Sequence, residues 1–351
     1  MQKTIIYRVA ELWLRERMSP SDIADLINRT IPGASLSRES VYPMLREALE
    51  LGFIRLQPPV HETLAGELEK KFGLAPGSVR VVECPTGRSN VGVSAAAAEW
   101  AGELVKEIAR NTKSPEVTVG LGPGSATLDF ARRFSEVIAE DANAPHLNLV
   151  AITAGSPATE PQYASVTYFN LFPPAKVKKY IGFFAETFMP KRDFEKLKEE
   201  QRLGIKAAFE AKSTVQFVAT SMGNKDDEHS LFRVFHEESG RLAGPVGKRP
   251  RWWKDCVGDC QYRPYSAVAP IEEGPDDLRA VTMFELDELA RMAETKDKHV
   301  MLIVRPCRRC GMTRAKALLP LLTSPKLRVF SKLVVDSATA TDLLTSAPAA
   351  P

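Results

Sequence analysis

Apolar side chains recur at helical spacing in three successive stretches of the first part of the chain. The first stretch covers residues 5–13. The second follows Ser19 and Pro20, where serine can cap a helix and proline can take its first position. Ser37 is placed to cap the third stretch, which ends just before Gly52, a residue type that favours helix termination. The pattern predicts three helices within residues 4–56.

The rest of the chain, beyond Pro58 and Pro59, alternates apolar runs with longer stretches of helical periodicity. Proline cannot continue a helix or pair in a central strand, so we expect the domain boundary there. The predicted strands are residues 79–82, 117–121, 147–152, 215–220, 300–304 and 333–336, and the predicted helices include residues 95–110, 125–138, 193–210, 284–294 and 315–322. Strands separated by helices predict an α/β fold with a mostly parallel sheet covered on both faces. We expect a small helical domain at residues 1–57, a linker at 58–66, a larger domain at 67–345 and a disordered tail at 346–351.

Composition narrows the class of protein. The 351 residues include 47 Lys and Arg against 44 Asp and Glu, a formal net charge of +3, which excludes a polycation that coats nucleic acid by charge alone. Mean hydropathy is −0.18, and no apolar run reaches the length of about 20 residues that a membrane span needs. The first residues lack the apolar core of a secretion signal, so we expect a cytoplasmic protein. Five cysteines are too few for a disulfide framework.

The predicted third helix begins with short polar side chains and carries arginine. Ser37, Arg38, Ser40, Tyr42 and Arg46 are the candidate contacts to double-stranded DNA. Hydroxyl and guanidinium groups bond phosphates and guanine edges, so this helix suits entry into a major groove. The first 57 residues hold 8 basic and 7 acidic side chains, which makes the electrostatic case weak. A helical dimerisation cap with a polar face is the alternative.

A glycine-rich turn joins the predicted strand at 117–121 to the helix that begins at residue 125. Gly122 and Gly124 let the backbone approach a ligand, and Ser125 and Thr127 add hydroxyls beside the free N–H groups of the helix start. Such a turn suits an anion, most naturally a phosphate. The alternative is a tight turn without a ligand.

Further short segments carry a family pattern: residues 18–24, 36–41, 48–54, 257–259, 311–318 and 334–344. Together with the glycine-rich turn they resemble the SorC-type sugar-binding bacterial transcriptional regulators, relatives of the DeoR type. The resemblance implies an N-terminal helix-turn-helix domain before a Rossmann-like, mostly parallel-sheet effector domain akin to sugar-phosphate isomerase and deaminase folds. It also implies operator DNA and a phosphorylated sugar or related small metabolite as partners, and a homodimer or homotetramer.

The resemblance assigns roles to individual residues. It implies that the glycine-rich turn holds the effector phosphate and that Asp259 binds a sugar hydroxyl. It further implies that the loop of Gly311 and Lys316 reaches the effector, with the lysine on a phosphate or ring oxygen. The alternative for Lys316 is an ordinary solvated lysine in the first turn of a helix.

Four of the cysteines form two close pairs, Cys256 with Cys260 and Cys307 with Cys310. The spacings are near those of four-thiolate sites, although 46 residues separate the pairs where zinc ribbons have about 15–20. In the family that the chain resembles, the two loops converge on the effector pocket, so the four thiolates could hold zinc or an iron–sulfur cluster there. A metal- or redox-sensing regulator is therefore the rival function, and buried cysteines that fill small apolar positions are the simpler alternative.

A catalytic function is the remaining alternative. Residues 222–232 faintly resemble the Gly-Asp-Gly-His loop of phosphogluconolactonase and deaminase relatives, with a single histidine, His229, in a charged loop. Such a histidine more often faces solvent than acts as a base, and a DNA-reading domain has little use on a metabolic enzyme. We expect no catalytic residues and no required cofactor, and keep a sugar-phosphate isomerase, deaminase or lactonase as the last alternative.

Overall fold

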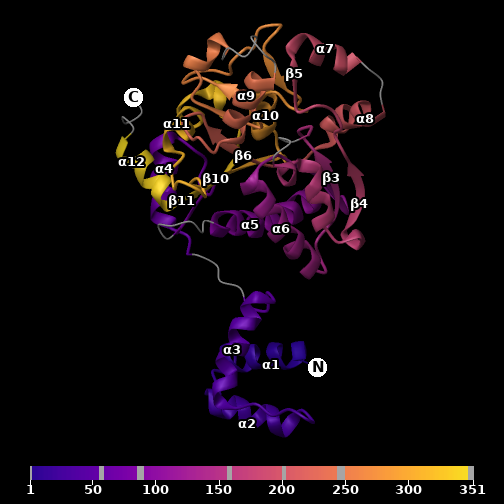
Figure 1. Cartoon of the computed structure of the whole chain (residues 1–351), viewed down its shortest axis with the longest axis vertical. Helices are drawn as coiled ribbons and strands as arrows, with labels where there is room; N and C mark the ends of the chain where they lie inside the picture. Colours follow the sequence, from indigo (N-terminus) through magenta and orange to yellow (C-terminus); the bar gives the residue numbers. More distant parts are fainter. Residues whose placement is uncertain are drawn as a thin grey trace. The chain divides into compact units, whose positions relative to one another are not determined.

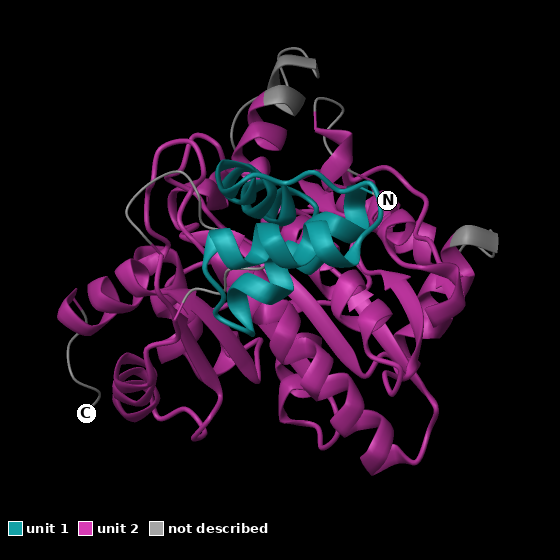
Figure 2. Cartoon of the chain, turned by 90° about the horizontal axis from the view of Figure 1, so that it is seen from below, with its two compact units in different colours: residues 1–57 teal, residues 58–351 magenta. Residues whose placement is uncertain are grey.

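The computed structural model describes residues 2–54, 59–84, 91–155, 160–199, 203–242 and 250–346. The chain divides into two compact units, Met1–Gln57 and Pro58–Pro351, which are coloured teal and magenta in Figure 2. Each unit has its own apolar core, and each is described by itself below.

The first unit consists of the three predicted helices, α1 (Gln2–Leu14), α2 (Pro20–Thr30) and α3 (Arg38–Glu50). Their apolar stripes meet in a small core of fully buried side chains, which includes Val9, Ile23 and Val41. Ser19 caps α2 by accepting a hydrogen bond from the backbone N–H of Asp22, as the sequence predicts. Three helices of this size, each buried along one stripe, confirm the helical domain.

Asn28 holds the connector between α2 and α3. Its side-chain amide donates to the backbone carbonyl of Leu36 at 2.9 Å, and its side-chain oxygen accepts from the backbone N–H of Leu36 at 2.7 Å. The two bonds use both backbone groups of Leu36, the residue just before the N-cap of α3. They therefore help to hold the start of α3 against the end of α2.

The second unit is built on a parallel sheet with the strand order β1-β11-β10-β6-β2-β3-β4. Its strands are β1 (Val79–Val82), β2 (Glu116–Leu121), β3 (His146–Ala151), β4 (Val177–Ile181), β6 (Phe217–Asn224), β10 (His299–Val304) and β11 (Lys332–Asp336). All six predicted strands are present, and every pairing along this order is parallel. The α/β fold class with a mostly parallel sheet is thus confirmed.

Helices cover both faces of this sheet (Figure 1). The described α-helices of this unit are α4 (Glu62–Phe72), α5 (Val91–Thr112), α6 (Ser125–Glu140), α7 (Lys191–Glu199), α8 (Leu203–Ala211), α9 (Leu231–Leu242), α10 (Leu286–Glu294), α11 (Ala315–Thr323) and α12 (Ser337–Ser346). The long helices α5 and α6 lie side by side on one face, and α10 and α11 lie on the other. Because both faces are covered, the central strands are apolar throughout, as in the almost fully buried run of β10.

The predicted linker at 58–66 is wrong beyond residue 59. Val60 forms an antiparallel bridge with Val82, and α4 begins at Glu62 and buries Ala65 and Leu68 in the core of the second unit. The amphipathic pattern of α4 thus overrides the breaking effect of the two prolines before it. At the other end of the chain, α12 includes Ser346, whereas 347–351 lie outside the described residues.

A hairpin extends the carboxyl end of β6. Its strands β7 (Gly258–Cys260) and β8 (Arg263–Tyr265) pair antiparallel, and β7 pairs with residues 222–224 at the end of β6. A second small sheet pairs β5 (Phe188–Pro190) with β9 (Leu278–Ala280). The hairpin brings the predicted residue Asp259 to the edge where β2 and β6 end.

Candidate functional site

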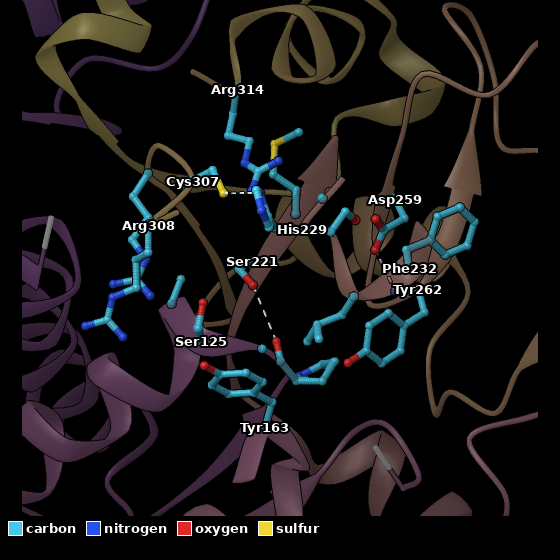
Figure 3. Close-up of a pocket in the computed structure, with 18 of the residues that line it drawn as sticks. Ser125, Tyr163, Ser221, His229, Phe232, Asp259, Tyr262, Cys307, Arg308 and Arg314 are labelled. Carbon is cyan, nitrogen blue, oxygen red and sulfur yellow. Dashed lines mark hydrogen bonds between the residues drawn. The ribbon is translucent and has the colours of Figure 1, made fainter. Parts of the chain in front are cut away.

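A cavity of about 440 Å³ lies at the carboxyl ends of β2, β6 and β10. The chain leaves β2 toward β3 but leaves β6 toward β10, in the opposite direction along the sheet. Where neighbouring strands part in this way, an open α/β sheet has its crevice, and ligands of such folds bind there. The cavity lies at this switch point, and Figure 3 shows the side chains that line it.

The glycine-rich turn after β2 forms the floor of the cavity. A side chain at Gly122 would place its Cβ 2.5 Å from Oγ1 of Thr220, so only glycine fits against the end of β6. Gly124 has a φ of +107°, a conformation that favours glycine, and directly precedes the first turn of α6. Ser125 starts α6 and lines the cavity, so the positive end of the helix dipole faces the cavity.

Arginines that follow β10 line one side. Arg305 is buried, and its Nη1 donates to Oδ2 of Asp129 at 2.6 Å, while Nη2 of Arg308 lies 3.2 Å from the same oxygen. Burial lowers the pKa of Arg305, the Asp129 carboxylate opposes this, and a guanidinium stays charged in either case. The second terminal nitrogen of Arg305, Nη2, is buried without a hydrogen-bond partner among the described residues. The cavity therefore has an unused cationic donor.

A further arginine comes from the end of the same loop, directly before α11. Nη2 of Arg314 lies 2.7 Å from Oδ2 of Asp227, and its Nη1 is buried without a hydrogen-bond partner among the described residues. Arg309 forms an exposed ion pair at 3.1 Å with Glu160, which also lines the cavity. Arg305, Arg308, Arg309 and Arg314 form a cationic wall, and all four come from the one loop between β10 and α11, which is far from the glycine-rich turn in sequence.

The opposite side carries a buried carboxyl group, with Asp259 and Tyr262 placed across the cavity from Ser125 and Arg308 (Figure 3). Burial raises the pKa of Asp259 to about 7, against the backbone N–H of Tyr262, which donates to Oδ2 at 3.0 Å, and the charge of Arg314. Its other oxygen, Oδ1, has no hydrogen-bond partner among the described residues. Near pH 7 this group can either donate or accept a hydrogen bond.

The turn of the β7–β8 hairpin presents two further polar side chains. Gln261 and Tyr262 have φ angles of 55° and 63°, so both central residues are left-handed, as a tight hairpin turn requires. Residues other than glycine, asparagine and aspartate are strained in that conformation, and strained residues are frequent at binding sites. The amide of Gln261 and the hydroxyl of Tyr262 line the cavity without hydrogen-bond partners among the described residues.

Unpartnered buried polar atoms therefore converge on one cavity. They belong to Asp259, Gln261, Tyr262, Arg305 and Arg314. A buried donor or acceptor left unpaired costs about 1–3 kcal/mol, a cost that a polar ligand can recover. The arrangement suits a ligand whose anionic group lies near the arginines and the start of α6 and whose hydroxyl groups lie near Asp259.

Some of the predicted effector-binding residues line the cavity and others do not. Gly124, Ser125 and Asp259 line the cavity, and Gly122 packs beneath it against Thr220. Thr127 is fully buried and its hydroxyl donates to the carbonyl of Pro123 at 3.3 Å, so it does not face a ligand.

The loop of Gly311 and Lys316 also departs from the prediction, because neither residue lines the cavity. Nζ of Lys316 is exposed and pairs with Asp226 at 2.6 Å, since α11 begins at residue 315 and its first turn points this side chain outward. Arg314, one residue before the helix, takes the place that the prediction gave to Lys316. An arginine run directly after an apolar strand is the signal that could have found the cationic wall.

The four-thiolate site is wrong. Cys256 is buried in an aromatic cluster with Trp253 and Phe232, where burial raises the pKa of its thiol to about 12, and Cys260 is buried in the main core. Among the described residues, Cys307 and Cys310 are grouped instead with Asp227 and His229.

The predicted DNA-contacting residues lie at the start of α3. Arg38, Tyr42 and Arg46 are exposed, and the ring of Tyr42 packs edge to face on Trp13 at 6.1 Å. The hydroxyls of Ser37 and Ser40 cap the helix, each accepting from the other's backbone N–H. The two serines thus fix the helix start, and the exposed side chains remain available for contacts.

Comparison with solved structures establishes the fold. The full-length sorbitol operon regulator SorC from Klebsiella pneumoniae superposes with a TM-score of 0.61 and 16% identity over 98% of this chain and 99% of that chain. A probable sor operon regulator from Shigella flexneri and a DeoR family transcriptional regulator from Listeria monocytogenes each give 0.56, with 16% and 17% identity, over 80% of this chain and 98% of theirs. No family model matches the sequence, and the search of curated proteins also found no match.

The chain therefore has the two-part fold of SorC-type regulators, a helical N-terminal unit followed by an α/β unit. None of the described helices is long and apolar enough to cross a membrane.

Proposed function

We propose that this protein is a DNA-binding transcriptional regulator whose operator binding responds to a phosphorylated sugar or a related small phosphorylated metabolite. One observation carries the proposal: the cavity joins unpartnered guanidinium N–H groups and the start of α6 to an unpartnered buried carboxyl oxygen. Arginine and helix N-termini are the groups that bind phosphate, and carboxyl oxygens bind sugar hydroxyls.

The DNA-binding part of the proposal is supported by the first unit. Its third helix is capped at its start and exposes Arg38, Tyr42 and Arg46 on one segment, which suits contacts to a major groove. The likeness in fold to the sorbitol operon regulator extends over both units and supports the same division of labour. A homodimer or homotetramer would match a palindromic operator.

Sensing, rather than catalysis, is supported by what the arginines already bind. Arg305 and Arg308 pair with Asp129 on α6, and Arg314 pairs with Asp227 after β6. A phosphate bound between them would compete with both carboxylates and shift the loops that carry these charges. A ligand that binds one arrangement of the loops better than another changes the population of each, as regulation requires.

The experiment measures thermal unfolding of the full chain with sugar phosphates, with the same sugars lacking phosphate, and with inorganic phosphate. We expect a phosphorylated compound to raise the melting temperature, by mass action on the folded state. Arg308→Met and Ser125→Asp should remove the rise, because the first deletes a half-exposed donor and the second places a negative charge at the start of α6. Lys316→Met is the matched control, since that lysine lies outside the cavity, and it should keep the rise.

The outcomes separate the alternatives. If no phosphorylated compound stabilises the protein, or if Arg308→Met and Ser125→Asp respond like the unaltered protein, the assigned cavity is wrong. Turnover of a stabilising compound into an isomer, a deaminated sugar or an acid would replace the sensor by an enzyme.

A further inference from the structure

Four side chains with metal-binding atoms meet beside the cavity. Asp227, His229, Cys307 and Cys310 each offer one ligand atom, and these four atoms lie within 4.8 Å of one another. Asp227 and His229 come from the segment after β6, and the cysteines come from the segment after β10. Strands β6 and β10 are neighbours in the sheet, so the parallel topology places both segments at the same edge.

Three of the six distances between these atoms are near those of a tetrahedral metal site, and all six are within 4.8 Å. Nδ1 of His229 lies 3.3 Å from Oδ1 of Asp227 and 3.6 Å from Sγ of Cys307, as Figure 3 shows for the latter pair. Sγ of Cys310 lies 3.7 Å from the same oxygen of Asp227. Tetrahedral zinc, with bonds of about 2.3 Å to sulfur and about 2.0 Å to nitrogen or oxygen, sets nitrogen and oxygen about 3.3 Å apart and sulfur about 3.5 Å from either. These three pairs of atoms are therefore already spaced nearly as a metal of this size would hold them.

The cysteine loop is shaped to present thiolates. The backbone N–H groups of Arg309 and Cys310 donate to Sγ of Cys307. The turn is closed by the N–H of Gly311, which donates to the carbonyl of Cys307 at 2.9 Å, and Gly311 has a φ of +75°. A tight turn over Cys-x-x-Cys-Gly brings the two sulfurs near one another, and the N–H groups stabilise negative charge on the first of them.

The other two ligands are fixed as well. Oδ1 of Asp227 accepts from the backbone N–H of His229 at 3.0 Å, and Oδ2 lies 2.7 Å from Nη2 of Arg314. Arg314 therefore holds one carboxylate oxygen and leaves the other directed at the cluster. A divalent metal with two thiolates, one carboxylate and a neutral imidazole carries one net negative charge, which the guanidinium of Arg314 offsets.

We propose that Asp227, His229, Cys307 and Cys310 form a tetrahedral site for a divalent, thiol-seeking transition metal, zinc foremost. Two sulfurs, one nitrogen and one oxygen in a tetrahedral arrangement are the ligand set that such a metal prefers. The site differs from the four-thiolate arrangement, because two of its ligands are not cysteines. It also does not depend on the proposed sugar-phosphate function.

The site lies in the wall of the cavity. His229, Cys307 and Arg314 line it, and Arg314 contacts Asp227 while it keeps an unpartnered nitrogen there. The metal joins the segments that follow β6 and β10, and so fixes the distance between the cationic wall and the hairpin that extends β6. Loss of the metal would loosen the binding side of the cavity without touching the core.

The experiment titrates the metal-free, reduced full chain with Co²⁺, which reports tetrahedral geometry by visible absorption and thiolate ligands by near-ultraviolet charge transfer, and then displaces it with Zn²⁺. We expect about one ion per chain, with both absorption signatures. Cys310→Ser and His229→Ala should each weaken binding at least 10-fold, because even the loss of a side chain that only orients a metal ligand costs about 10-fold to 100-fold in affinity. The charge-transfer band should fall in Cys310→Ser and persist in His229→Ala, a split that unfolding would not produce. Cys310 is exposed, so its serine variant is expected to fold.

Two controls make the test specific. Cys84→Ser removes a half-buried thiol outside the cluster, and Cys256→Ala removes a member of the rejected four-thiolate set; both should bind Co²⁺ like the unaltered protein. Cobalt binding without thiolate charge transfer would overturn the proposal, as would affinities of Cys310→Ser and His229→Ala equal to that of the unaltered protein. A Cys307–Cys310 disulfide whose reduction restores no metal binding would overturn it too.

Discussion

Asp259 is the residue whose ionisation should be visible in the stability of the whole chain. Burial raises its pKa in the folded protein to about 7, against about 3.9 for an exposed aspartate in the unfolded chain. The folded state therefore holds the proton more tightly than the unfolded state. The contribution of Asp259 to stability is therefore greatest below about pH 4, falls as the pH rises from about 4 to 7, and levels off above that range.

Asp259→Asn should remove the fall in stability that ionisation of Asp259 causes between about pH 4 and 7. We expect the variant to be more stable than the unaltered protein at pH 8, on the order of 2–4 kcal/mol, and about equal to it at pH 4, since asparagine resembles the protonated carboxyl group and cannot ionise. Urea unfolding at both values measures the difference. Comparing the two proteins cancels the contribution of His236, which both contain and whose pKa burial lowers to about 4. An equal gain at the two pH values would contradict the buried, proton-holding state of Asp259.

Individual residues show how far the sequence can place side chains at the cavity. Ser125 and Asp259 could be placed there because they stand directly beside glycines at strand ends, where the backbone leaves little choice of direction. Thr127 and Lys316 could not be excluded, because the first turn of a helix points neighbouring residues to different sides, and that angle depends on packing. The metal cluster was missed since it joins two segments whose contact follows only from the order of the strands.

At the scale of one element, α3 offers the test of DNA binding. Arg38→Ala should weaken binding to a selected operator by about 1–3 kcal/mol if the arginine contacts a base, and by less if it contacts phosphate. Arg38→Ala combined with Arg46→Ala should weaken it further, as measured by fluorescence anisotropy at fixed salt. Arg15→Ala, just after the end of α1, is the matched control: it removes the same charge from an exposed position of the same unit and should have a small effect. Equal losses for the Arg15 and α3 variants would point to unspecific charge rather than recognition.

The turn between β2 and α6 gives a prediction about packing. In Gly122→Ala the new Cβ would lie 2.5 Å from Oγ1 and 2.9 Å from Cβ of Thr220, so one of the two strand ends must shift. Overpacking of this kind costs about 1–3 kcal/mol, which urea unfolding measures. Gly66→Ala is the control, because nothing lies within 4 Å of its added Cβ in α4, and it should be neutral or stabilising. A neutral Gly122→Ala would mean that β2 and β6 do not part as tightly as described.

The same scale shows how far elements follow from patterning. Strands buried on both faces, such as β2 and β10, were predictable from continuous apolar runs. The edge strand β4 was not, because its central residues Lys178, Lys179 and Tyr180 are exposed and give no apolar run. Charged side chains on an edge strand protect a sheet from pairing with other chains, and the same side chains interrupt the apolar pattern by which a strand is predicted.

For the whole molecule, the two separate cores predict two steps of unfolding. The core of the first unit is made by α1, α2 and α3 alone, and that of the second unit by the sheet and its helices. Unfolding enthalpy scales with length at about 0.7 kcal/mol per residue near 60 °C, so the first unit should contribute roughly 40 kcal/mol and the second about 200 kcal/mol. Calorimetry of the full chain should therefore resolve a small and a large transition.

Ligands should act on these two transitions selectively, because a ligand stabilises the part that it binds. Operator DNA should raise the midpoint of the small transition, and a phosphorylated effector that of the large one. Binding of both together then measures their coupling: an effector that releases the operator must lower the rise produced by DNA, and DNA must lower the effector's rise by the same free energy. A single transition that contains the unfolding enthalpy of both units, and that either ligand shifts by the same amount, would contradict this prediction. The two units would then unfold as one.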